Sequence, residues 1–548
     1  MKPSNSYQRQ RNYTLERYRA ILGYAGSVLV IIGATFFVPL LVLPFYPDEL
    51  PYAVPFVLTG LGLAVIGGAL WRWLVPHERA FSPTVQESMM MMVILWLVAI
   101  VAGMIPFAVI TEMSFTLSMF ESTSGWTGTG LTVVDPPSMP RIILLYRSFA
   151  QVVGGAGFAI IALSAVTAPA GIGLSVAEGR TEQLAPHVRR SAEIVVTMYA
   201  VYLVVGVLAL LLAGMTPFDA INHAFTGVAT GGFSTRAESI GYWDSPAVEM
   251  VLVVLMILGA TNFLTAWLLI RRNYGAVIHN GEIRLSIVVM PLSIVLMLLV
   301  VTSGLYAAGD KAVRVAIFET TSAMTTTGFN SVDHNVLGGF GLLLLTVLMV
   351  IGGGSGSTAA GLKQFRVYTL YKGLKWEIRR MFMPRHSVNE PTIWHGGQRS
   401  FLSDSEIRHT ALFVFIYMTG LVISAGVMTA HGYSVGDSLY ESASTLSAAG
   451  LSVGVTAPDA PPAVLWTQIV GMFLGRLEFF AVIVGVSRLA LDLRVMRPRF
   501  KRPRDSGKTP PAQSRMPVEA LRTLERPVPI VRPPGTDGDQ PRADSDHR

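Results

Sequence analysis

Residues 319–329 read ETTSAMTTTGF, a run of small and hydroxylated residues that ends in a glycine and an aromatic residue. The pattern recurs at 121–131, 223–233 and 441–451, and in every copy the terminal glycine lies nine residues after the first residue. The copies begin 102, 96 and 122 residues apart along the chain. Because self-similarity at a nearly regular spacing is typical of repeat architectures, the sequence predicts one structural unit that is used four times.

The composition of the 548-residue chain is that of a membrane protein. Hydrophobic residues make up 51% of the chain, charged residues make up 14%, and the mean hydropathy is +0.50. These values are too apolar for an ordinary soluble domain, so the lipid bilayer is the first expected partner. The absence of cysteine excludes a disulfide framework and thiolate chemistry.

Each copy of the motif stands at the same place in a longer order of segments. An apolar run long enough to cross about 30 Å of hydrocarbon comes first, then a short half-polar segment, the motif, and a second apolar run. The half-polar segments are too short to span a bilayer, so they are predicted to be re-entrant pore helices beside a watery cavity. The first runs are 89–110, 192–215, 285–308 and 409–431, the half-polar segments are 112–126, 217–229, 312–324 and 435–446, and the second runs are 142–170, 247–270, 337–371 and 463–490.

The predicted fold is an all-α polytopic membrane protein with four membrane–pore loop–membrane repeats around a pseudo-fourfold pore. Two apolar runs, 21–45 and 52–74, precede the first repeat and add an N-terminal two-helix hairpin, which brings the total to about ten transmembrane helices. The Pro- and Arg-rich end of the chain is predicted to be a disordered cytoplasmic tail. The expected units are a cytoplasmic N-terminus (1–20), the hairpin (21–78), four pore repeats (79–175, 176–275, 276–385 and 386–495) and the tail (496–548).

Lysine and arginine residues set the predicted orientation. With the N-terminus inside, 36 of the 42 fall on the cytoplasmic side, 5 fall on the outer side, and Arg476 lies mid-membrane. Cytoplasmic loops of membrane proteins carry such an excess of positive residues. We therefore expect a multi-pass protein of the plasma (inner) membrane, with both termini in the cytoplasm and all four glycine motifs toward the outer side.

The four motifs carry the chemistry expected of an ion filter. A dehydrated cation needs oxygen ligands from several directions, and a ring of backbone carbonyls supplies them without burying full negative charges. Glycine at the point of convergence allows the unusual backbone angles that this requires. Tight helix packing by small residues is the alternative, and it fits a single motif better than four in register. The predicted filter residues are Thr127, Gly128, Thr129, Gly130, Ala229, Thr230, Gly231, Gly232, Thr325, Thr326, Thr327, Gly328, Ser447, Ala448, Ala449 and Gly450.

Charged residues near the motifs have two predicted roles. The acids that open three of the motifs, and His223 at the same place in the second, are expected to tie each pore helix to neighbouring backbone rather than to touch ions. A second set of acids follows the four glycines and would give the outer mouth a cation-attracting field. These residues are Asp135, Glu238, Asp333 and Asp459.

A glycine-rich interruption divides the second apolar run of the third repeat. So many glycines cannot continue a stable helix, so the sequence predicts an intramembrane loop below the filter that acts as a gate, with a packing kink as the alternative. The predicted gate residues are Gly352, Gly353, Gly354, Ser355, Gly356, Ser357, Thr358, Gly361 and Lys363.

Arg476 lies near the middle of the last apolar run. A charge at this depth is expected to face protein or water. Arg476 is therefore predicted to be a pore-lining cation, and a structural pair with Glu478 or with helix-end carbonyls is the alternative.

These motifs resemble the Trk/Ktr/HKT superfamily of potassium transporters, specifically its TrkH-like branch, over about residues 20–495. The resemblance implies K⁺ bound at the four filter loops, gating by residues 352–361, and Arg476 in the pore. It also implies a homodimer and a cytoplasmic ring of TrkA-like nucleotide-binding regulatory subunits. The residues that carry it are 325–329, 231–235, 351–358 and 475–478, together with Arg147, Gln151, Gly154 and Gly155.

By this resemblance the chain carries K⁺ into the cell, is not an enzyme, and holds no organic cofactor of its own. Any nucleotide is expected on the partner subunit, since no phosphate-binding loop is evident in this sequence, and no nucleic-acid partner is expected. Gly130 favours potassium, because sodium-preferring plant relatives carry serine at that place. Two departures from the family pattern are Ala359-Ala360-Gly361 in the gate, where a glycine-richer stretch is usual, and the hydroxyl-poor fourth filter at 447–450.

Two other functions stay open at this point. A Na⁺- or H⁺-coupled K⁺ symporter, or a less selective Na⁺/K⁺ permease, would use the same loops, and the sequence does not separate either from a gated channel. Residues 353–356 also fit the loose motif of intramembrane serine proteases, whose serine needs a histidine on a neighbouring helix. No histidine falls in the middle of a predicted span, so the protease is the more distant alternative.

Overall fold

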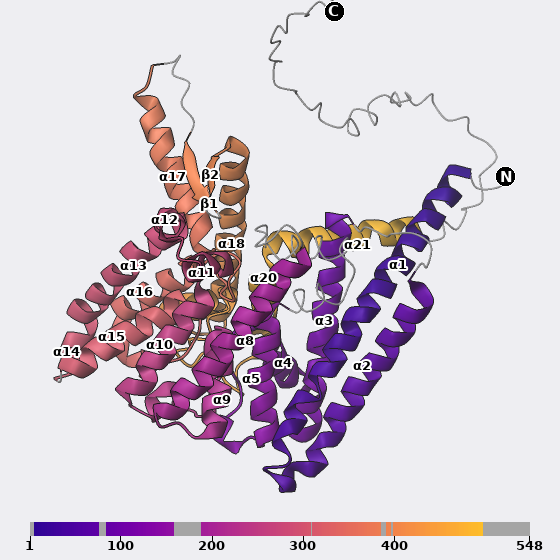
Figure 1. The fold of residues 1–548 in the computed structure, drawn as a ribbon, viewed down its shortest axis with the longest axis horizontal. Coiled ribbons are helices and arrows are strands. Elements are labelled where there is room, and N and C mark those ends of the chain that lie inside the picture. Colours follow the sequence, from indigo (N-terminus) through magenta and orange to yellow (C-terminus); the bar gives the residue numbers. More distant parts are fainter. Residues whose placement is uncertain are drawn as a thin grey trace, which may run out of the picture. The chain divides into compact units, whose positions relative to one another are not determined.

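The computed structural model describes residues 5–75, 84–157, 188–307, 309–384, 391–395 and 398–496, and the predicted tail lies outside these ranges from 497 onward. Nearly every element is a helix (Figure 1). The α-helices are α1 (Asn5–Thr35), α2 (Ala53–Leu74), α3 (Val85–Ile110), α4 (Phe115–Thr127), α5 (Arg141–Ala156), α8 (Val188–Leu212), α9 (Pro217–Val228), α10 (Pro246–Ala260), α11 (Phe263–Ile270), α12 (Tyr274–His279), α13 (Gly281–Met297), α14 (Ser303–Leu305), α15 (Gly309–Met324), α16 (Gly338–Ile351), α17 (Gln364–Met381), α18 (Asp404–Ala430), α19 (Val435–Leu446), α20 (Pro462–Leu477) and α21 (Phe479–Met496). The short turns are the 3₁₀ segments η1 (Val38–Val42), η2 (Pro47–Tyr52), η3 (Pro136–Ser138), η4 (Ser239–Tyr242) and η6 (His334–Leu337) and the π-helical segment η5 (Leu298–Thr302).

The four predicted repeats appear in the described chain as the same order of elements. The first helices are α3, α8, α13 and α18, the pore helices are α4, α9, α15 and α19, and the second helices begin with α5, α10, α16 and α20. The pore helices have 13, 12, 16 and 12 residues. At 1.5 Å per residue none of them can cross about 30 Å of hydrocarbon, which agrees with the predicted re-entrant segments.

The start of three pore helices is fixed by a hydroxyl cap at one repeated position. Ser114, Thr216 and Ser434 each lie 16 residues before the terminal glycine of their motif. Each side-chain oxygen accepts a hydrogen bond from the backbone N–H three residues later. Such a cap satisfies a helix-end donor that would otherwise lack a partner in the membrane. The cap and the glycine together therefore set the length of the pore helix.

The second helices differ from the continuous spans that the sequence predicts for three of the repeats. The run 247–270 is broken between α10 and α11 by a bend of 108°, and the run 463–490 is broken between α20 and α21 by a bend of 100°. The first break is stabilised by Asn262, whose Oδ1 accepts from the amide of Leu264 at 2.8 Å. At the second break Glu478 adopts φ 63° and lies 3.0 Å from Lys363 and 2.6 Å from Arg366.

The second helices of the first and third repeats, α5 and α16, also end before the predicted runs do. In the third repeat α16 ends at Ile351 and α17 begins at Gln364, as the glycine-rich interruption predicts. In the first repeat α5 ends at Ala156, and the remainder of the predicted run 142–170 lies outside the described residues beyond Gly157.

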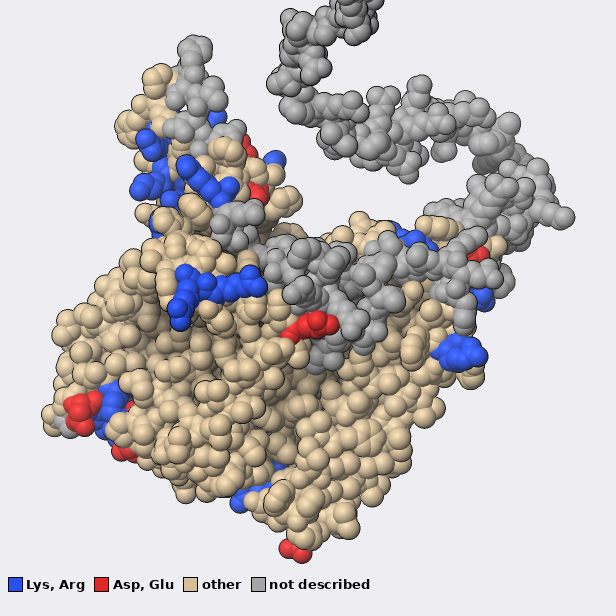
Figure 2. Space-filling view, in the orientation of Figure 1, with Lys and Arg blue, Asp and Glu red and all other residues tan. Residues whose placement is uncertain are grey.

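The described residues contain seven helices long and apolar enough to span a membrane, and nine if each bent pair counts as one span. The tenth predicted span is the one only partly described. In the space-filling view most of the visible lysine and arginine gathers toward the end where α17 lies, beside a broad surface without charge (Figure 2).

The N-terminal hairpin is held together by close contact between glycines. A β-carbon on Gly26 would lie 2.5 Å from the carbonyl oxygen of Gly67, and the reverse approach has the same distance. Gly33 and Gly60 approach each other in the same way, seven residues away along each helix. Small residues let membrane helices approach closely enough for dispersion forces to act. Figure 1 shows α1 and α2 side by side, as this packing requires.

One element departs from the predicted all-α fold. Strand β1 (Thr392–His395) pairs antiparallel with β2 (Gln398–Phe401), and the two precede α18. Ile393 and Leu402 form a small apolar cluster with Tyr368 of α17. This cluster stabilises a hairpin that is too short to be recognised from alternation in the sequence.

Candidate functional site

The four motif glycines form a closed ring. Each glycine faces the carbonyl oxygen of the residue that precedes the glycine of the next repeat, and a β-carbon would approach that oxygen within 2.0–2.3 Å. The last contact leads from the fourth repeat back to the first, so the four loops surround one axis. The pairs are Gly130 with Gly231, Gly232 with Thr327, Gly328 with Ala449, and Gly450 with Thr129.

Backbone conformation repeats around this ring. The four glycines have φ from 73° to 92°, and the residues two places earlier are left-handed too: Gly128 (68°), Thr230 (50°), Thr326 (51°) and Ala448 (47°). Non-glycine residues keep such angles only where their surroundings hold them. Here the amide just before each motif glycine donates to the carbonyl five residues earlier, at 2.8–2.9 Å in all four repeats. The loops therefore share one geometry although their side chains differ.

The ring glycines line a single cavity of about 370 Å³. Gly130, Gly232, Gly328 and Gly450 all contribute to its wall. Of the four acids predicted at the outer mouth, Asp135 and Asp333 line this cavity, whereas Glu238 and Asp459 are exposed residues outside its lining. The structure thus brings the sixteen predicted filter residues together and brings in only two of the four acids.

A buried strut ties each pore helix to the chain just beyond its glycine, as the sequence predicts. Glu121 accepts from the amide of Val133 at 2.6 Å, and Glu441 accepts from the amide of Thr456 at 2.9 Å. In the second repeat His223 takes the same role, with Nε2 2.9 Å from the hydroxyl of Ser234. The side chains of both glutamates and of His223 are fully buried.

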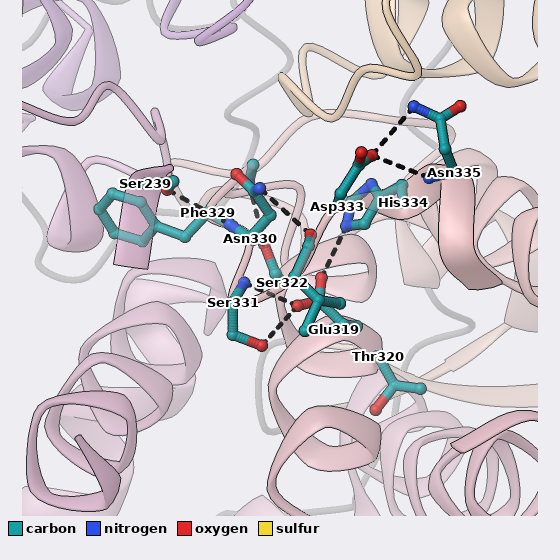
Figure 3. Close-up of polar contacts among 12 residues, drawn as sticks. Ser239, Glu319, Thr320, Ser322, Phe329, Asn330, Ser331, Asp333, His334 and Asn335 are labelled. Carbon is teal, nitrogen blue, oxygen red and sulfur yellow. Dashed lines mark hydrogen bonds and ion pairs between the residues drawn. The ribbon is translucent and has the colours of Figure 1, made fainter. Parts of the chain in front are cut away.

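Figure 3 shows the strut of the third repeat. Glu319 points toward Ser331 and His334, which follow the filter glycine, whereas Thr320 points away from this group. One carboxylate oxygen of Glu319 accepts from the amide and the hydroxyl of Ser331 at 2.8 and 2.7 Å. The other lies 2.7 Å from Nε2 of His334. Glu319 precedes the filter loop in the chain, and Ser331 and His334 follow it. Their hydrogen bonds therefore tie the two ends of the loop together.

The second helix of the first repeat braces the neighbouring filter loop. Gln151 of α5 donates to the carbonyl oxygen of Gly231 at 2.6 Å and accepts from the amide of Phe233 at 3.3 Å. Arg147 lies one turn away, 4.0 Å from the centre of the Phe233 ring, and pairs with Glu121 at 3.2 Å. Both residues belong to the pattern that carries the family resemblance, and the structure gives them a contact with the filter.

The predicted gate residues form a loop (residues 352–363) in direct contact with the filter loops. The amide of Ala360 donates to the hydroxyl of Thr326 at 3.0 Å. The hydroxyl oxygens of Thr358 and Thr230 are 3.0 Å apart. Thr230 and Thr326 hold the left-handed positions of two of the four glycine loops, so the 352–363 loop lies directly against the glycine ring.

The 352–363 loop is held in place by the break in the second repeat. The amide of Gly354 donates to the carbonyl of Ala260 at 2.9 Å, and the hydroxyl of Thr358 donates to that of Gly259 at 2.9 Å. These carbonyls belong to the last turn of α10, where the bend removes their helical partners. The loop thus satisfies backbone groups that the broken helix exposes inside the membrane.

Two polar residues that sequence reasoning missed also hold this loop. Glu282 is 3% exposed at the start of α13, and its Oε1 accepts from the amide of Ser355 at 2.7 Å. Its Oε2 lies 3.5 Å from Nδ2 of Asn262. The only local signals for these residues are an acid just before an apolar run and an asparagine inside one.

Arg476 lies between the 352–363 loop and the end of α5. It donates to the carbonyl oxygens of Thr358 at 2.9 Å, of Gly155 at 3.0 Å, and of Gly154. The carbonyls of Gly154 and Gly155 belong to the last turn of α5, so they are helix-end carbonyls of the kind that the sequence offered as an alternative partner, whereas Thr358 lies in the 352–363 loop. Glu478, the other proposed partner, pairs with Lys363 and Arg366.

Comparison with known proteins agrees with this arrangement. The family model described as "TrkH: Cation transport protein" matches residues 56–490. The Trk system potassium uptake protein TrkH of Vibrio parahaemolyticus is 31% identical over 492 residues, covering 85% of this chain and 98% of the relative. TrkH of Escherichia coli is 30% identical over 481 residues, with the same shares covered.

A solved structure shows the same fold. The crystal structure of the potassium transporter TrkH from Vibrio parahaemolyticus superposes with a TM-score of 0.74 at 29% sequence identity, covering 85% of this chain and 98% of that one. These relatives are transporters and not enzymes, which removes the intramembrane protease from consideration. The repeats, the glycine ring and these matches together place the chain in the TrkH family of cation transport proteins.

Proposed function

We propose that this protein is a K⁺ uptake pathway whose selectivity filter is the ring of four loops at 127–130, 229–232, 325–328 and 447–450. The observation that carries the proposal is that the four motif glycines close one ring and line one cavity. The relatives named above are potassium uptake proteins, which supports K⁺ as the transported ion. K⁺ is substrate here, and no organic cofactor is required on this chain.

Backbone oxygens are the proposed ligands. The threonine hydroxyls of two loops are occupied by each other, which leaves the backbone carbonyls for the ion. The hydroxyl oxygens are 2.7 Å apart in the pair Thr127 and Thr129, and 2.8 Å apart in the pair Thr325 and Thr327. Each pore helix ends at its filter loop, where a helix C-terminus carries a partial negative charge of about half an electron. Four such ends around one axis favour a cation without burying a full negative charge.

The 352–363 loop is the proposed gate, and Arg476 is the proposed cation beneath the filter. The loop contacts two filter loops above and continues into α17, so a force on α17 would reach the filter through it. The partner that moves α17 is proposed to be a cytoplasmic TrkA-like ring of nucleotide-binding subunits, acting on a homodimer of this chain. Both termini would then lie in the cytoplasm, as the lysine and arginine distribution favours.

Ion flux into proteoliposomes tests the filter. We expect purified wild-type protein to carry K⁺ and Rb⁺ faster than Na⁺, with the regulatory subunit added where flux is low. Gly130→Ser should abolish this preference, because a β-carbon at Gly130 would lie 2.2 Å from the carbonyl oxygen of Gly231. A wild-type protein that carries no cation with its partner present would refute the proposed function.

Replacement of loop glycines tests the gate. Changing Gly352, Gly356 and Gly361 to alanine removes three residues with φ of 71°, 69° and 83°, which alanine rarely adopts. We expect altered control of K⁺ flux by the regulatory subunit, with the K⁺ preference kept. Unchanged flux and unchanged control would show that the loop is not the gate.

A further inference from the structure

Three of the four struts around the filter are carboxylates, and they differ in the partner of the carboxylate. In the first repeat Glu121 pairs with a permanent cation, Arg147, at 3.2 Å. In the fourth, Glu441 is held by neutral donors, among them the hydroxyl of Ser452 at 2.8 Å. Among the described residues, only the carboxylate of the third strut contacts a histidine, His334, that is also hydrogen-bonded to a residue of another repeat. This difference singles out the third strut.

His334 connects two pore helices through a buried chain of hydrogen bonds. Its Nε2 lies 2.7 Å from Glu319 of α15, and its Nδ1 lies 2.7 Å from the hydroxyl of Tyr440 of α19. Glu319 and Tyr440 have no exposed surface, and His334 is 2% exposed. The His334 and Tyr440 rings meet nearly at right angles, at 81°. The chain thus runs from the third filter to the helix that carries the fourth.

The hydrogen-bond roles in this chain follow from its ends. A carboxylate oxygen accepts, which assigns the proton of the His334–Glu319 hydrogen bond to Nε2 of His334. Nδ1 is then an acceptor and takes the proton of the Tyr440 hydroxyl. A tyrosine hydroxyl carries one proton, so it can donate this bond. With this assignment both ring nitrogens of His334 have a hydrogen-bond partner.

The position of His334 is itself fixed by the turn that follows the filter. The carboxylate of Asp333 accepts from the amide of Asn335 at 3.0 Å and starts η6, which begins with His334 (Figure 3). Asp333 is exposed and lines the cavity at the glycine ring. Glu319, Tyr440 and Asp333 are therefore the titratable side chains bonded to His334 or adjacent to it in this turn.

The same two repeats also meet at the glycine ring. Gly328 of the third loop abuts the carbonyl oxygen of Ala449 of the fourth, where a β-carbon would lie 2.0 Å from the oxygen. His334 and Tyr440 form a second link behind this contact, away from the axis. The third and fourth filter loops are therefore linked at two places, through Gly328 and Ala449 and through His334 and Tyr440.

We propose that His334 is a positioning residue for ion selectivity, which holds the third and fourth filter loops at the spacing that K⁺ requires through its bond to Tyr440. This inference rests on the proposed function and deepens it. Sodium is smaller than potassium, so a filter whose loops are less firmly spaced would adapt to sodium more easily. Loss of the link should therefore lower preference for K⁺ rather than total cation flux.

Three variants test the link in the full-length protein with its regulatory partner. Tyr440→Phe removes only the hydroxyl, His334→Gln keeps a donor toward Glu319, and the double variant combines the two. We expect each single change to lower the K⁺-to-Na⁺ flux ratio about fivefold, the effect of one hydrogen bond of ordinary strength. The double variant should lose no more than a single variant, because both remove the same bond.

Matched controls separate positioning from general damage. His431→Gln changes an exposed histidine at the end of α18, and Tyr433→Phe removes a hydroxyl from a residue packed beside Met428. Both should leave the flux ratio within about twofold. The thermal unfolding midpoint of each variant reports folding independently of the ratio.

The outcomes are distinct. Wild-type K⁺ preference that survives unchanged in Tyr440→Phe and His334→Gln overturns the positioning role and leaves the proposed function standing. A double variant whose loss is the product of the two single losses also overturns it, because the residues would then act separately. A wild type without K⁺ preference overturns the proposed function and this inference with it.

Discussion

Arg476 donates a hydrogen bond to the carbonyl oxygen of Thr358 at 2.9 Å, and so joins the last repeat to the loop beneath the filter. The same guanidinium bonds Gly155 of the first repeat at 3.0 Å. We expect Arg476→Gln to release the 352–363 loop and to raise K⁺ flux without the regulatory subunit by about tenfold, since hydrogen bonds to charged groups contribute about 1.5–3 kcal/mol.

The measurement is Rb⁺ uptake into proteoliposomes with and without the regulatory subunit. Arg271→Gln is the control, because Arg271 is exposed and packs on Trp267, away from the filter. If Arg476→Gln left basal flux at the wild-type level, the hydrogen bonds of Arg476 to Thr358 and Gly155 would have no part in gating.

Gly328→Ala is expected to abolish selective flux. A β-carbon there would lie 2.0 Å from the carbonyl oxygen of Ala449, and φ of 92° is unfavourable for alanine. Gly339→Ala in α16 is the matched control, because nothing lies within 4 Å of its β-carbon position. K⁺-selective flux equal to that of wild type in Gly328→Ala would contradict the ring geometry.

Glu282→Ala is expected to destabilise the closed position of the 352–363 loop. The change leaves the amide of Ser355 without its carboxylate acceptor, and a donor left unsatisfied costs about 1–3 kcal/mol. Basal Rb⁺ flux should rise and the thermal midpoint should fall, whereas Glu282→Gln, which keeps an oxygen acceptor, should have a smaller effect.

Glu377→Ala serves as the control for Glu282, since Glu377 is an exposed residue on α17 that pairs only loosely with Arg380, at 3.8 Å. Equal flux in Glu282→Ala and wild type would show that other contacts suffice to hold the loop.

An ion-pair cluster of Asp244, Lys311 and Arg314 predicts a pH-dependent contribution to stability. The hydrogen bond from Lys311, with help from Arg314, lowers the pKa of the Asp244 carboxyl. A lowered folded-state pKa means that the pair stabilises the protein above the ordinary aspartate value of about 3.9 and loses this effect as pH falls through the folded value. Since Asp244 is 56% exposed, the contribution is expected to be about 0.2–1 kcal/mol.

Asp244→Asn should therefore lower the thermal midpoint slightly at pH 7, and the difference from wild type should shrink at pH 3. One molar salt should reduce the difference as well, because it screens exposed charges. Asp310→Asn, at an exposed residue near the start of α15, is the control. A difference that grows toward low pH would refute the assignment of charge to this cluster.

The repeats could be predicted from the sequence because their signals are local. The 16-residue distance from the caps Ser114, Thr216 and Ser434 to the motif glycines lies within one short stretch of chain, and so does the run of glycines after Ile351. Hydropathy and spacing were therefore enough to predict the pore helices, the four glycine loops and the interruption between α16 and α17.

The breaks at Asn262 and Glu478 were not predicted, because hydropathy continues through both. Each break is stabilised by a distant partner: the amide of Gly354 for the end of α10, and Lys363 with Arg366 for Glu478. A window of sequence contains only one member of each pair, so it reports an apolar span where the tertiary structure has a bend.

By itself the sequence determined the four units, their order and the four glycine loops, since these depend on neighbours a few positions apart. Only the tertiary structure decided which partner completes each strut and what holds the gate loop. Arg476 and Gly154 are 322 residues apart, and His334 and Tyr440 are 106 apart. Such contacts form only when the repeats close into a ring. The polar side chains are then buried between repeats, and buried polar groups need hydrogen-bond partners.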